Sequence, residues 1–334
     1  MPSKYTVVLV VASASVVTSF AIYYLRKKWK HVVWEAVGTV ESLYIYPLKS
    51  GRAIEVNGAN CTEYGLQLNT FNQLHVRDRC LVVYKEETRA FQTARNYKQI
   101  LLIETFINKD GFILTAPNQN HLIIKIPSLK NSYQDEIIMW NGEKVFTLDC
   151  GDEAAKWVSR YLLKEDHGLR LGYHDGIHKR DINKYHQSYI EVHPKLKNAT
   201  SGMYSDLSSV LLMNKSSVDD LASKIPNSRV SVRNFRPNIV VQGVPPYAED
   251  DWEKIKIGET VLKTVMPCSR CSVTTIEPDT ATWTDNYEPI KTLKTYRTST
   301  QYQSGHSFPN FGLYMGLENV GEIRVGDVVY VPKK

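Results

Sequence analysis

The stretch Thr260–Ile276, which reads TVLKTVMPCSRCSVTTI, places two segments rich in Val and Thr on either side of a cysteine pair. Because β-branched residues favour strands, Thr260–Met266 predicts one strand and Cys271–Ile276 a second. Further strand patterns surround this stretch, at Val210–Met213, Pro237–Val241, Lys254–Ile257 and Ile323–Val331. The C-terminal half is therefore predicted to be β-rich, with one short helix capped by Ser216 or Ser217.

Hairpin patterns follow one another in the N-terminal half of the chain. A first strand over Glu35–Tyr46 breaks at Pro47. Three pairs of strand patterns then flank short polar turns, at Cys80–Tyr84 with Arg89–Thr93, Ile100–Phe106 with Phe112–Thr115, and Ile137–Trp140 with Lys144–Leu148. One helical pattern, with Asp152 as its cap, follows the last hairpin. We expect an antiparallel, β-rich lobe closed by this helix.

The segment Lys164–Ser201 is polar and lacks sustained periodicity, so it is the best candidate for a boundary. Helices do not alternate regularly with strands, and no glycine-rich dinucleotide fingerprint occurs. The predicted fold class is α+β and mostly β. It combines a β-rich N-terminal domain at residues 35–165 with a β-barrel-like domain at residues 185–332.

The net charge of +6 is concentrated at the N-terminus. Residues 1–30 contain five basic residues and no acid, and the rest of the chain holds 36 basic against 35 acidic residues. A nearly neutral remainder argues against a nucleic-acid-binding surface, which would need clustered positive charge.

Tyr5–Leu25 carries no charge over 21 residues, which is long enough as a helix to cross a hydrocarbon layer of about 30 Å. The basic run Arg26–Lys30 follows it, so the positive-inside rule predicts that the C-terminal part faces the cytosol. We therefore expect residues 1–30 to form a transmembrane anchor and basic stalk. A cleaved signal with a site near Ala12–Ala14 is the alternative, disfavoured because the basic run lies after the apolar segment.

The cysteine pair in Pro267–Cys271 is the most suggestive chemical feature. A zinc site would need a second ligand pair, and a thioredoxin-like redox pair would need a helix where a strand is predicted. Two buried structural thiols remain an alternative. Arg270 stands beside Cys271, and a neighbouring guanidinium favours a thiolate, which is a soft ligand for a metal.

Polar or cationic residues also cluster where predicted strands end. They occur in Tyr46–Ser50, Arg77–Arg79, Tyr204–Ser208 and Asn234–Asn238. Loops at strand ends are where sites are commonly built, although each group taken singly is more often a turn or a salt bridge. Together with Ser269 and Arg270, they predict a pocket for a phosphorylated ligand.

Histidines are concentrated in the polar segment. His174 and His178 stand four apart, a spacing that would place both imidazoles on one face of a helix. Gly172 and Gly176 argue against a helix there, so surface histidines are the favoured interpretation over a metal site.

Taken in order behind an anchor, these motifs resemble those of the MOSC-domain family, and within it the amidoxime-reducing branch. The resemblance covers residues 35–334. It implies a molybdenum cofactor, Mo-molybdopterin, which is a pterin-dithiolene with a terminal phosphate, and it places the metal ligand on Cys271, with Cys268 only a neighbour. The cofactor contacts that it implies are Lys49, Ser50, Arg79, Ser208, Arg236, Asn238, Ser269, Arg270 and Tyr314.

The resemblance further implies that Asp206 delivers a proton or orients the substrate. The implied activity is reduction of N-hydroxylated compounds such as amidoximes, hydroxylamines and N-hydroxyguanidines, with electrons from NADH through cytochrome b5 reductase and cytochrome b5. The implied location is the mitochondrial outer membrane, facing the cytosol. Two residues depart from the family pattern: Leu207 replaces a usual hydroxyl residue and Ala281 a usual glycine.

Two other functions remain open at this point. A sulfur-carrier or cofactor-handling protein would use the same kind of domain. A non-enzymatic membrane adaptor would use the cysteine pair only for structure or for zinc.

Overall fold

The computed structural model describes residues 32–68, 76–298 and 308–334. The predicted anchor, Tyr5–Leu25, lies outside these residues, and none of the helices within them is both long and apolar enough to cross a membrane. Residues 36–331 form one compact unit, which contains every pocket and cluster described below. The few other described residues, 32–35 and 332–334, belong to a separate unit.

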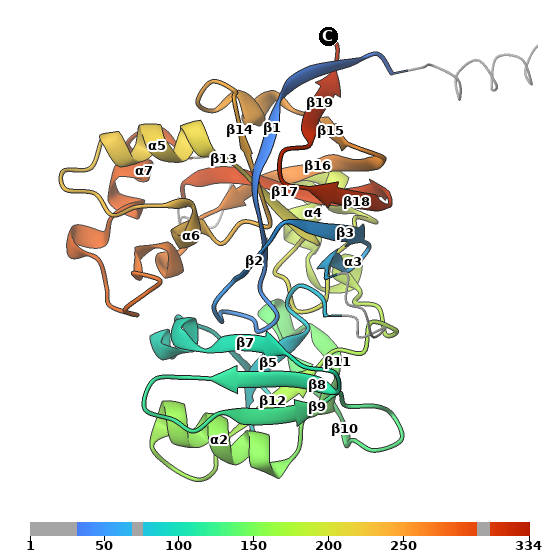
Figure 1. The fold of residues 1–334 in the computed structure, drawn as a ribbon, viewed down its shortest axis with the longest axis vertical. Helices are drawn as coiled ribbons and strands as arrows, with labels where there is room; N and C mark the ends of the chain where they lie inside the picture. The colour runs from blue at the N-terminus through green and yellow to red at the C-terminus, as the bar shows by residue number, and fades with distance from the viewer. Residues whose placement is uncertain (1–31, 69–75, 299–307) are drawn as a thin grey trace, which may run out of the picture. The chain divides into compact units, whose positions relative to one another are not determined.

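The C-terminal half builds a closed barrel (Figure 1). Its strands run in the order β14 (Ile239–Gln242), β13 (Val210–Asn214), β17 (Asn310–Asn319), β16 (Thr260–Ser269), β15 (Lys254–Ile257), β19 (Val328–Pro332) and β1 (Trp34–Ile45). β1 also pairs with β14, which closes the ring, and β2 (Ile54–Val56) adds to the other edge of β1. Buried aliphatic side chains from these strands fill the interior. The prediction of a mostly-β chain with a barrel is confirmed.

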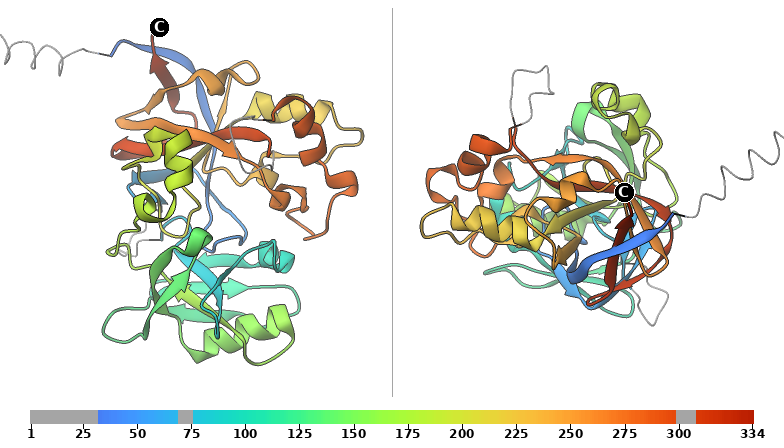
Figure 2. Two further views of the ribbon diagram at one scale, coloured as in Figure 1. Left: turned by 180° about the vertical axis from the view of Figure 1, so that it is seen from behind. Right: turned by 90° about the horizontal axis from the view of Figure 1, so that it is seen from above.

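The N-terminal half contributes two antiparallel sheets. One has the order β10 (Gln134–Ile138), β11 (Lys144–Asp149), β12 (Leu169–Tyr173), β5 (Leu81–Lys85) and β6 (Phe91–Gln92). The other joins β7 (Glu104–Ile107), β8 (Gly111–Thr115) and β9 (Leu122–Lys125), and α2 (Asp152–Leu163) packs on β12 and β9 (Figure 2). A further small sheet joins β18 (Gly321–Arg324), β3 (Gly58–Thr62) and β4 (Gly65–Gln67).

The remaining helical elements are short and lie mostly in the connections. They are α3 (Ile182–Tyr185), α4 (Gln187–Val192), α5 (Lys215–Ser223), α6 (Val232–Phe235), α7 (Ile290–Tyr296) and the 3₁₀ turns η1 (Lys98–Leu102), η2 (Trp140–Gly142), η3 (Pro194–Leu196), η4 (Ala248–Asp251), η5 (Ser272–Thr275) and η6 (Asp285–Tyr287).

Two predicted helix caps are wrong by one to three residues. The side chain of Asn214, rather than Ser216 or Ser217, accepts from the backbone of α5. Asp152 is the first residue of α2, and Gly151 precedes it without a side-chain cap. The predicted strand over Ile100–Phe106 is also wrong in its first half, which belongs to η1.

The predicted strand Cys271–Ile276 is wrong, because these residues form the turn η5. The hydroxyl of Thr274 donates to the carbonyl of Cys271 at 3.0 Å, and that of Thr275 donates to Ser272 at 2.7 Å. Such local side-chain bonds to the backbone compete with strand pairing. β16 therefore ends at Ser269, and the chain turns away from the barrel at Cys271.

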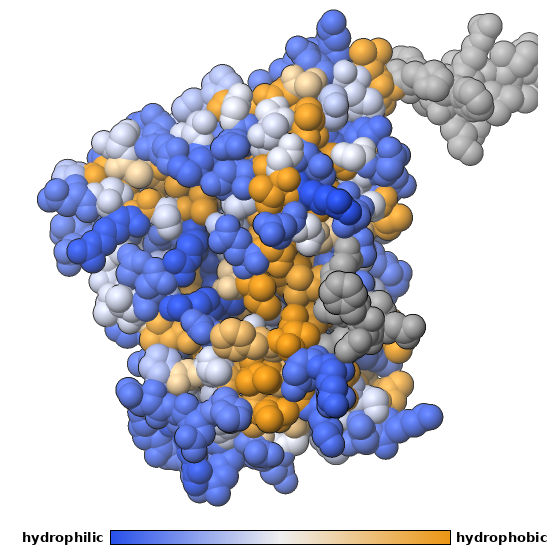
Figure 3. All heavy atoms as spheres, viewed as in Figure 1, coloured by the Kyte–Doolittle hydropathy of each residue, from blue (hydrophilic) through white to orange (hydrophobic). Residues whose placement is uncertain are grey.

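The outer surface is mainly hydrophilic on the face drawn in Figure 3, with apolar side chains gathered near its middle. The pocket described next is lined by residues of the barrel and by residues from connections in the N-terminal half.

Candidate active site

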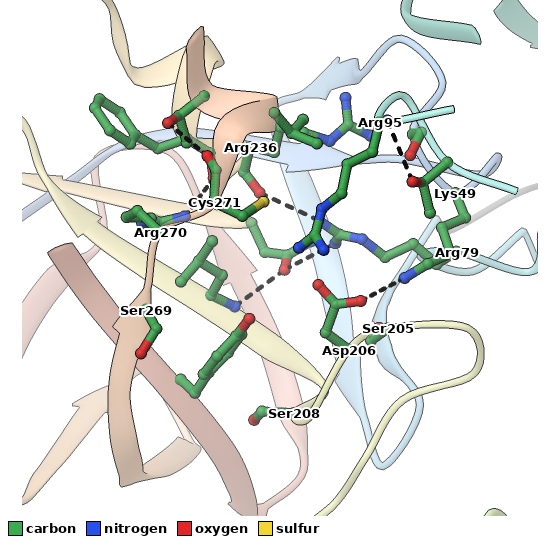
Figure 4. Close-up of a pocket in the computed structure, with 18 of the residues that line it drawn as sticks. Lys49, Arg79, Arg95, Ser205, Asp206, Ser208, Arg236, Ser269, Arg270 and Cys271 are labelled. Atoms are coloured by element: carbon green, nitrogen blue, oxygen red, sulfur yellow. Dashed lines mark hydrogen bonds and ion pairs between the residues drawn. The ribbon is translucent and has the colours of Figure 1, made fainter. Parts of the chain in front are cut away.

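One pocket collects every residue that the sequence predicts for the site (Figure 4). Lys49 and Ser50 follow β1, Arg79 precedes β5, Asp206 and Ser208 precede β13, and Arg236 and Asn238 join α6 to β14. Ser269 ends β16, Arg270 and Cys271 follow it, and Tyr314 lies on β17. We call this the cationic pocket, because its lining holds five Lys or Arg side chains and one carboxylate.

Two arginines enclose the buried ring of Tyr46. The guanidinium carbon of Arg79 lies 4.7 Å from the ring centroid and that of Arg236 lies 4.3 Å from it. Arg79 also pairs with Asp78 and donates to Asn238 Oδ1 at 3.3 Å. Stacking on an aromatic face holds both planar cations in place at the pocket wall.

Arg236 is the cation with the least compensation. Its Nη2 is buried and has no hydrogen-bond partner. Burial, with a smaller contribution from the nearby Arg79 cation, lowers the pKa of Arg236 to about 10. A buried N–H of a cation without a hydrogen-bond partner is unfavourable, so this corner of the pocket would gain stability from an anion.

Three residues of the pocket adopt left-handed backbone. The φ angles are +66° at Ser50, +48° at Arg79 and +57° at Arg236. Residues other than glycine rarely occupy this region, and such positions concentrate at functional sites. In each case the unusual backbone belongs to a residue that the sequence predicts for the site.

Asp206 is held firmly by two neighbours. Lys49 Nζ donates to Asp206 Oδ1 at 2.7 Å and to the carbonyl of Tyr204 at 2.8 Å, and Trp140 Nε1 donates to the same carboxylate oxygen at 3.1 Å. Burial raises the pKa of Asp206, but the Lys49 ammonium lowers it more, so the pKa lies well below its usual range. A carboxylate in these surroundings accepts hydrogen bonds and is poorly suited to donate a proton.

The two cysteines have different surroundings. Cys268 is only 2% exposed, and burial raises the pKa of its thiol. Cys271 is partly exposed and lines the pocket, where Arg95 hydrogen-bonds its side chain (Figure 4). Arg270 instead donates to the carbonyls of Phe235 and Phe311 at 3.0 and 2.6 Å. The guanidinium that contacts the Cys271 side chain therefore belongs to Arg95, and not to the adjacent Arg270.

Sequence reasoning missed Arg95 and Trp140, which both line the pocket. The Arg95 guanidinium carbon lies 4.7 Å from the centroid of the Trp140 ring. Arg95 follows a predicted strand in the same way as the residues that were identified, so that signal could have found it. Trp140 also ends a predicted strand, but its side chain is not one of the polar or cationic types on which the site prediction rested.

A second group of buried charges, the Arg180 cluster, consists of Glu143, Arg180 and His186. Arg180 donates to both carboxylate oxygens of Glu143, at 2.8 and 2.6 Å, and His186 Nε2 lies 3.1 Å from Glu143 Oε2. Arg180 also donates to the carbonyls of Met203 at 3.1 Å and Asp206 at 3.2 Å. The cluster thus fixes the loop that carries Asp206.

His174 and His178, the pair singled out in the polar segment, have different surroundings. His174 is buried, and burial lowers its pKa to about 4. His178 is an exposed residue 2.7 Å from Asp175. Within residues 32–68, 76–298 and 308–334, no group of three or more His, Cys, Asp or Glu side chains is arranged to hold a metal ion.

One of the two departures from the family pattern, Leu207, lines a pocket together with Cys271, and the other, Ala281, lies in a turn. Leu207 is 8% exposed and packs in a small apolar cluster. Ala281 adopts a φ of +51°, a conformation in which glycine is unstrained, so the usual glycine has a physical reason at this turn.

Comparisons with known proteins show the family of the chain. Residues 37–165 match the MOSC N-terminal beta barrel domain, and residues 199–330 match the MOSC domain. Mitochondrial amidoxime-reducing component 1 of Homo sapiens is 36% identical, over 92% of this chain and 87% of that protein. Its counterpart in Mus musculus is 38% identical, over 89% and 83%. Mitochondrial amidoxime reducing component 2 of Bos taurus is 34% identical, over 89% and 84%.

Proposed function

The chain belongs to the MOSC-domain family that includes the amidoxime-reducing components, and we propose that it is a molybdenum-cofactor-dependent reductase of N-hydroxylated nitrogen compounds. The observation that carries the proposal is a partly exposed cysteine, Cys271, facing a pocket with a surplus of cations. A thiolate and an anion site side by side are what a phosphorylated, metal-bearing cofactor needs.

The residues present fit such a cofactor. The unpartnered Nη2 of Arg236, with Arg79 and Lys49 nearby, suits a phosphate. Cys271 supplies one soft ligand for the metal. The remaining polar groups of the pocket suit the pterin, and they come from Ser50, Ser208, Asn238, Ser269, Arg270 and Tyr314.

When bound, the cofactor supplies a two-electron reduction in which the N–O bond breaks, two protons are taken up and the oxygen leaves as water. The protein's part is to orient the substrate. Asp206, fixed as a carboxylate by Lys49 and Trp140, can accept a hydrogen bond from the N–H or O–H of an amidoxime. Orientation is therefore the role that we assign to Asp206, in preference to proton delivery.

Electrons reach the site, in this proposal, from NADH through cytochrome b5 reductase and cytochrome b5. The amidoxime-reducing relatives are named as mitochondrial proteins. We propose the outer membrane for this chain, with residues 5–25 as the anchor and residues 36–331 facing the cytosol. Anchoring donor and acceptor to one surface would raise their effective concentration.

The cofactor-handling and adaptor alternatives differ from the reductase in one measurable way. Purified holoprotein is mixed with cytochrome b5, its reductase, NADH and benzamidoxime, and NADH consumption and benzamidine formation are followed. We expect benzamidine in proportion to NADH, its loss in Cys271→Ala, and its retention in Cys268→Ala as the matched control. Holoprotein that contains molybdenum but forms no benzamidine would contradict the reductase and favour cofactor handling.

A further inference from the structure

A groove, which we call the edge groove, runs along β9 in the N-terminal half. Its lining contains six consecutive residues of the chain, 122–127, and the rest of its wall includes Tyr133, residues 149–154 and Arg170. Its volume is about 520 Å³. None of its lining residues belongs to the cationic pocket. The edge groove therefore follows one extended segment for about 20 Å, the length of six residues in a strand.

β9 is the outer strand of its sheet and pairs with one neighbour among the described strands, β8 (Figure 1). The pairing is antiparallel, and Ile126 continues it by donating its N–H to the carbonyl of Asp110 at 3.2 Å. Because these groups alternate in direction along a strand, the N–H and C=O groups of Ile123 and Lys125 point away from β8. They have no backbone partner among the described residues. An unpaired edge of this kind is a template for an added strand.

The exposed face of the same sheet carries an apolar row that ends at this edge. In the strand register Phe106 lies opposite Ile113, and Ile113 lies opposite Ile123. Phe106 and Ile123 are 52% and 55% exposed. Figure 3 shows apolar side chains gathered over β7 and β8. Because cross-strand neighbours on one face contact each other, an apolar residue of an added strand would cover the end of this row at Ile123.

The opposite wall of the groove is acidic. Asp152 and Glu153 begin α2 there. Asp152 pairs with Arg170 at 2.9 Å, whereas Glu153 is exposed and pairs with no cation among the described residues. This carboxylate is complementary to a basic side chain. The same wall limits what fits, because a lone extended segment needs only its own width, whereas the β9 edge of a second copy would bring β8 with it.

We propose that the edge groove binds an extended segment of a partner protein that alternates apolar and basic residues, and that this segment joins the sheet as a strand beside β9. Its main chain bonds to the outward groups of Ile123 and Lys125, one apolar side chain packs on Ile123, and a basic side chain pairs with Glu153. Lys125 and Pro127 limit pairing with unrelated strands, as charges and prolines do at natural sheet edges. The proposal is independent of the reductase function.

Peptide binding to the full-length chain tests the proposal. Two capped seven-residue peptides are compared, one alternating valine with lysine and the other valine with glutamate. We expect the lysine peptide to bind about threefold more tightly, the size of one exposed charge pair. It should also slow hydrogen exchange over residues 122–127. Glu153→Lys should reverse the preference between the two peptides. Equal affinities in the wild type, or no slowing of exchange over this segment, would overturn the proposal.

Two variants of one residue separate the main chain from the side chain. Lys125→Pro removes an N–H that does not bond to β8 and should weaken the lysine peptide about fivefold, the equivalent of one hydrogen bond. Lys125→Gln keeps this N–H and should bind like the wild type, and unfolding curves show that both variants are folded. Unchanged affinity in Lys125→Pro would contradict strand addition. Self-association of the free chain that is lost in Lys125→Pro would assign the edge to a second copy and overturn the proposal.

Discussion

Two buried groups of charge lie near Asp206 and differ in how fully they are compensated. In the Arg180 cluster, Arg180 donates to both oxygens of Glu143 and to backbone carbonyls, and His186 contacts the same carboxylate. In the cationic pocket, five cations face one lining carboxylate, and Arg236 keeps an unpartnered nitrogen. A compensated cluster has no need of a ligand, whereas an uncompensated one is stabilised by an anion.

The two groups also differ in backbone conformation. Arg79 and Arg236 of the cationic pocket have positive φ, while Glu143, Arg180 and His186 do not. The compensated cluster acts as a scaffold for the loop before β13, and the strained, uncompensated one is built for binding. The predictions below test this division from the largest expected effect on stability to the smallest.

Breaking the compensated cluster should have the largest effect. Arg180→Met leaves Glu143 buried without its main partner and is expected to lower the free energy of unfolding by about 3–5 kcal/mol. Urea denaturation measures it. Arg233→Met is the matched control, because Arg233 pairs with Asp279 at the surface, where such pairs contribute about 1 kcal/mol or less. Similar losses in both variants would refute the division.

Protonation of Glu143 at low pH should remove the contribution of the Arg180 cluster to stability. Burial raises the pKa of Glu143, but hydrogen bonds from His186 and Arg180 lower it more, to about 2. Against an unfolded value of about 4.3, this contributes roughly 3 kcal/mol. Because the folded pKa is depressed, the contribution is present above about pH 4.3 and lost as the pH falls toward 2.

Urea denaturation at successive pH values from 5 to 2.5 measures this contribution. Other carboxylates with a lowered pKa, Asp149 among them, also make stability depend on pH. The contribution of Glu143 is therefore the difference between the wild type and a variant that lacks this carboxylate. Glu143→Gln is expected to show a shallower decline than the wild type. An unchanged slope would show that the Glu143 carboxylate is not stabilised by its partners.

Removing the uncompensated charge of Arg236 should not lower the free energy of unfolding, in contrast to removing Arg180. Arg236→Gln is expected to leave cofactor-free protein equally stable or to stabilise it by about 1 kcal/mol, since a buried unpaired charge is unfavourable. The same variant should retain less cofactor. Thermal unfolding of the cofactor-free protein and pterin content after expression measure the two effects. A loss of more than about 2 kcal/mol would mean that Arg236 is structural.

The smallest expected effect measures the free-energy cost of a left-handed backbone conformation at a residue outside the pocket. Lys164 ends α2 with a φ of +66°, where glycine is favoured. Lys164→Gly should therefore raise the free energy of unfolding by about 0.5–1 kcal/mol, read as a higher Tm. Lys156→Gly, in the middle of the same helix, should lower it by about 1 kcal/mol. The same sign in both would remove strain as an argument at Ser50, Arg79 and Arg236.

Much of the barrel could be predicted from the sequence, because β13 and most of β16 are rich in apolar and β-branched residues and β15 alternates lysine with isoleucine. β12 could not, since Leu169–Tyr173 lies in a polar segment and gains its place only by pairing with β5 and β11. The turn after Cys271 was missed because threonine hydroxyls satisfy it locally. Strand propensity takes no account of either effect.

Prediction of the site from local sequence patterns is limited in the same way. Lys49, Arg79 and Arg236 could be predicted because each stands at the end of a strand pattern or in a family motif. The Arg180 cluster could not, because it depends on contacts between segments 37 to 43 residues apart in the sequence. Their meeting is decided by the fold and leaves no local pattern.

The central claim is that Cys271 binds the metal of a molybdenum cofactor. It is tested most directly by metal analysis of purified wild-type protein, Cys271→Ala and Cys268→Ala, with unfolding curves to show that all three are folded. The account predicts one molybdenum per chain in the wild type and in Cys268→Ala, and none in Cys271→Ala. Zinc in place of molybdenum, or equal loss of metal in both variants, would contradict it.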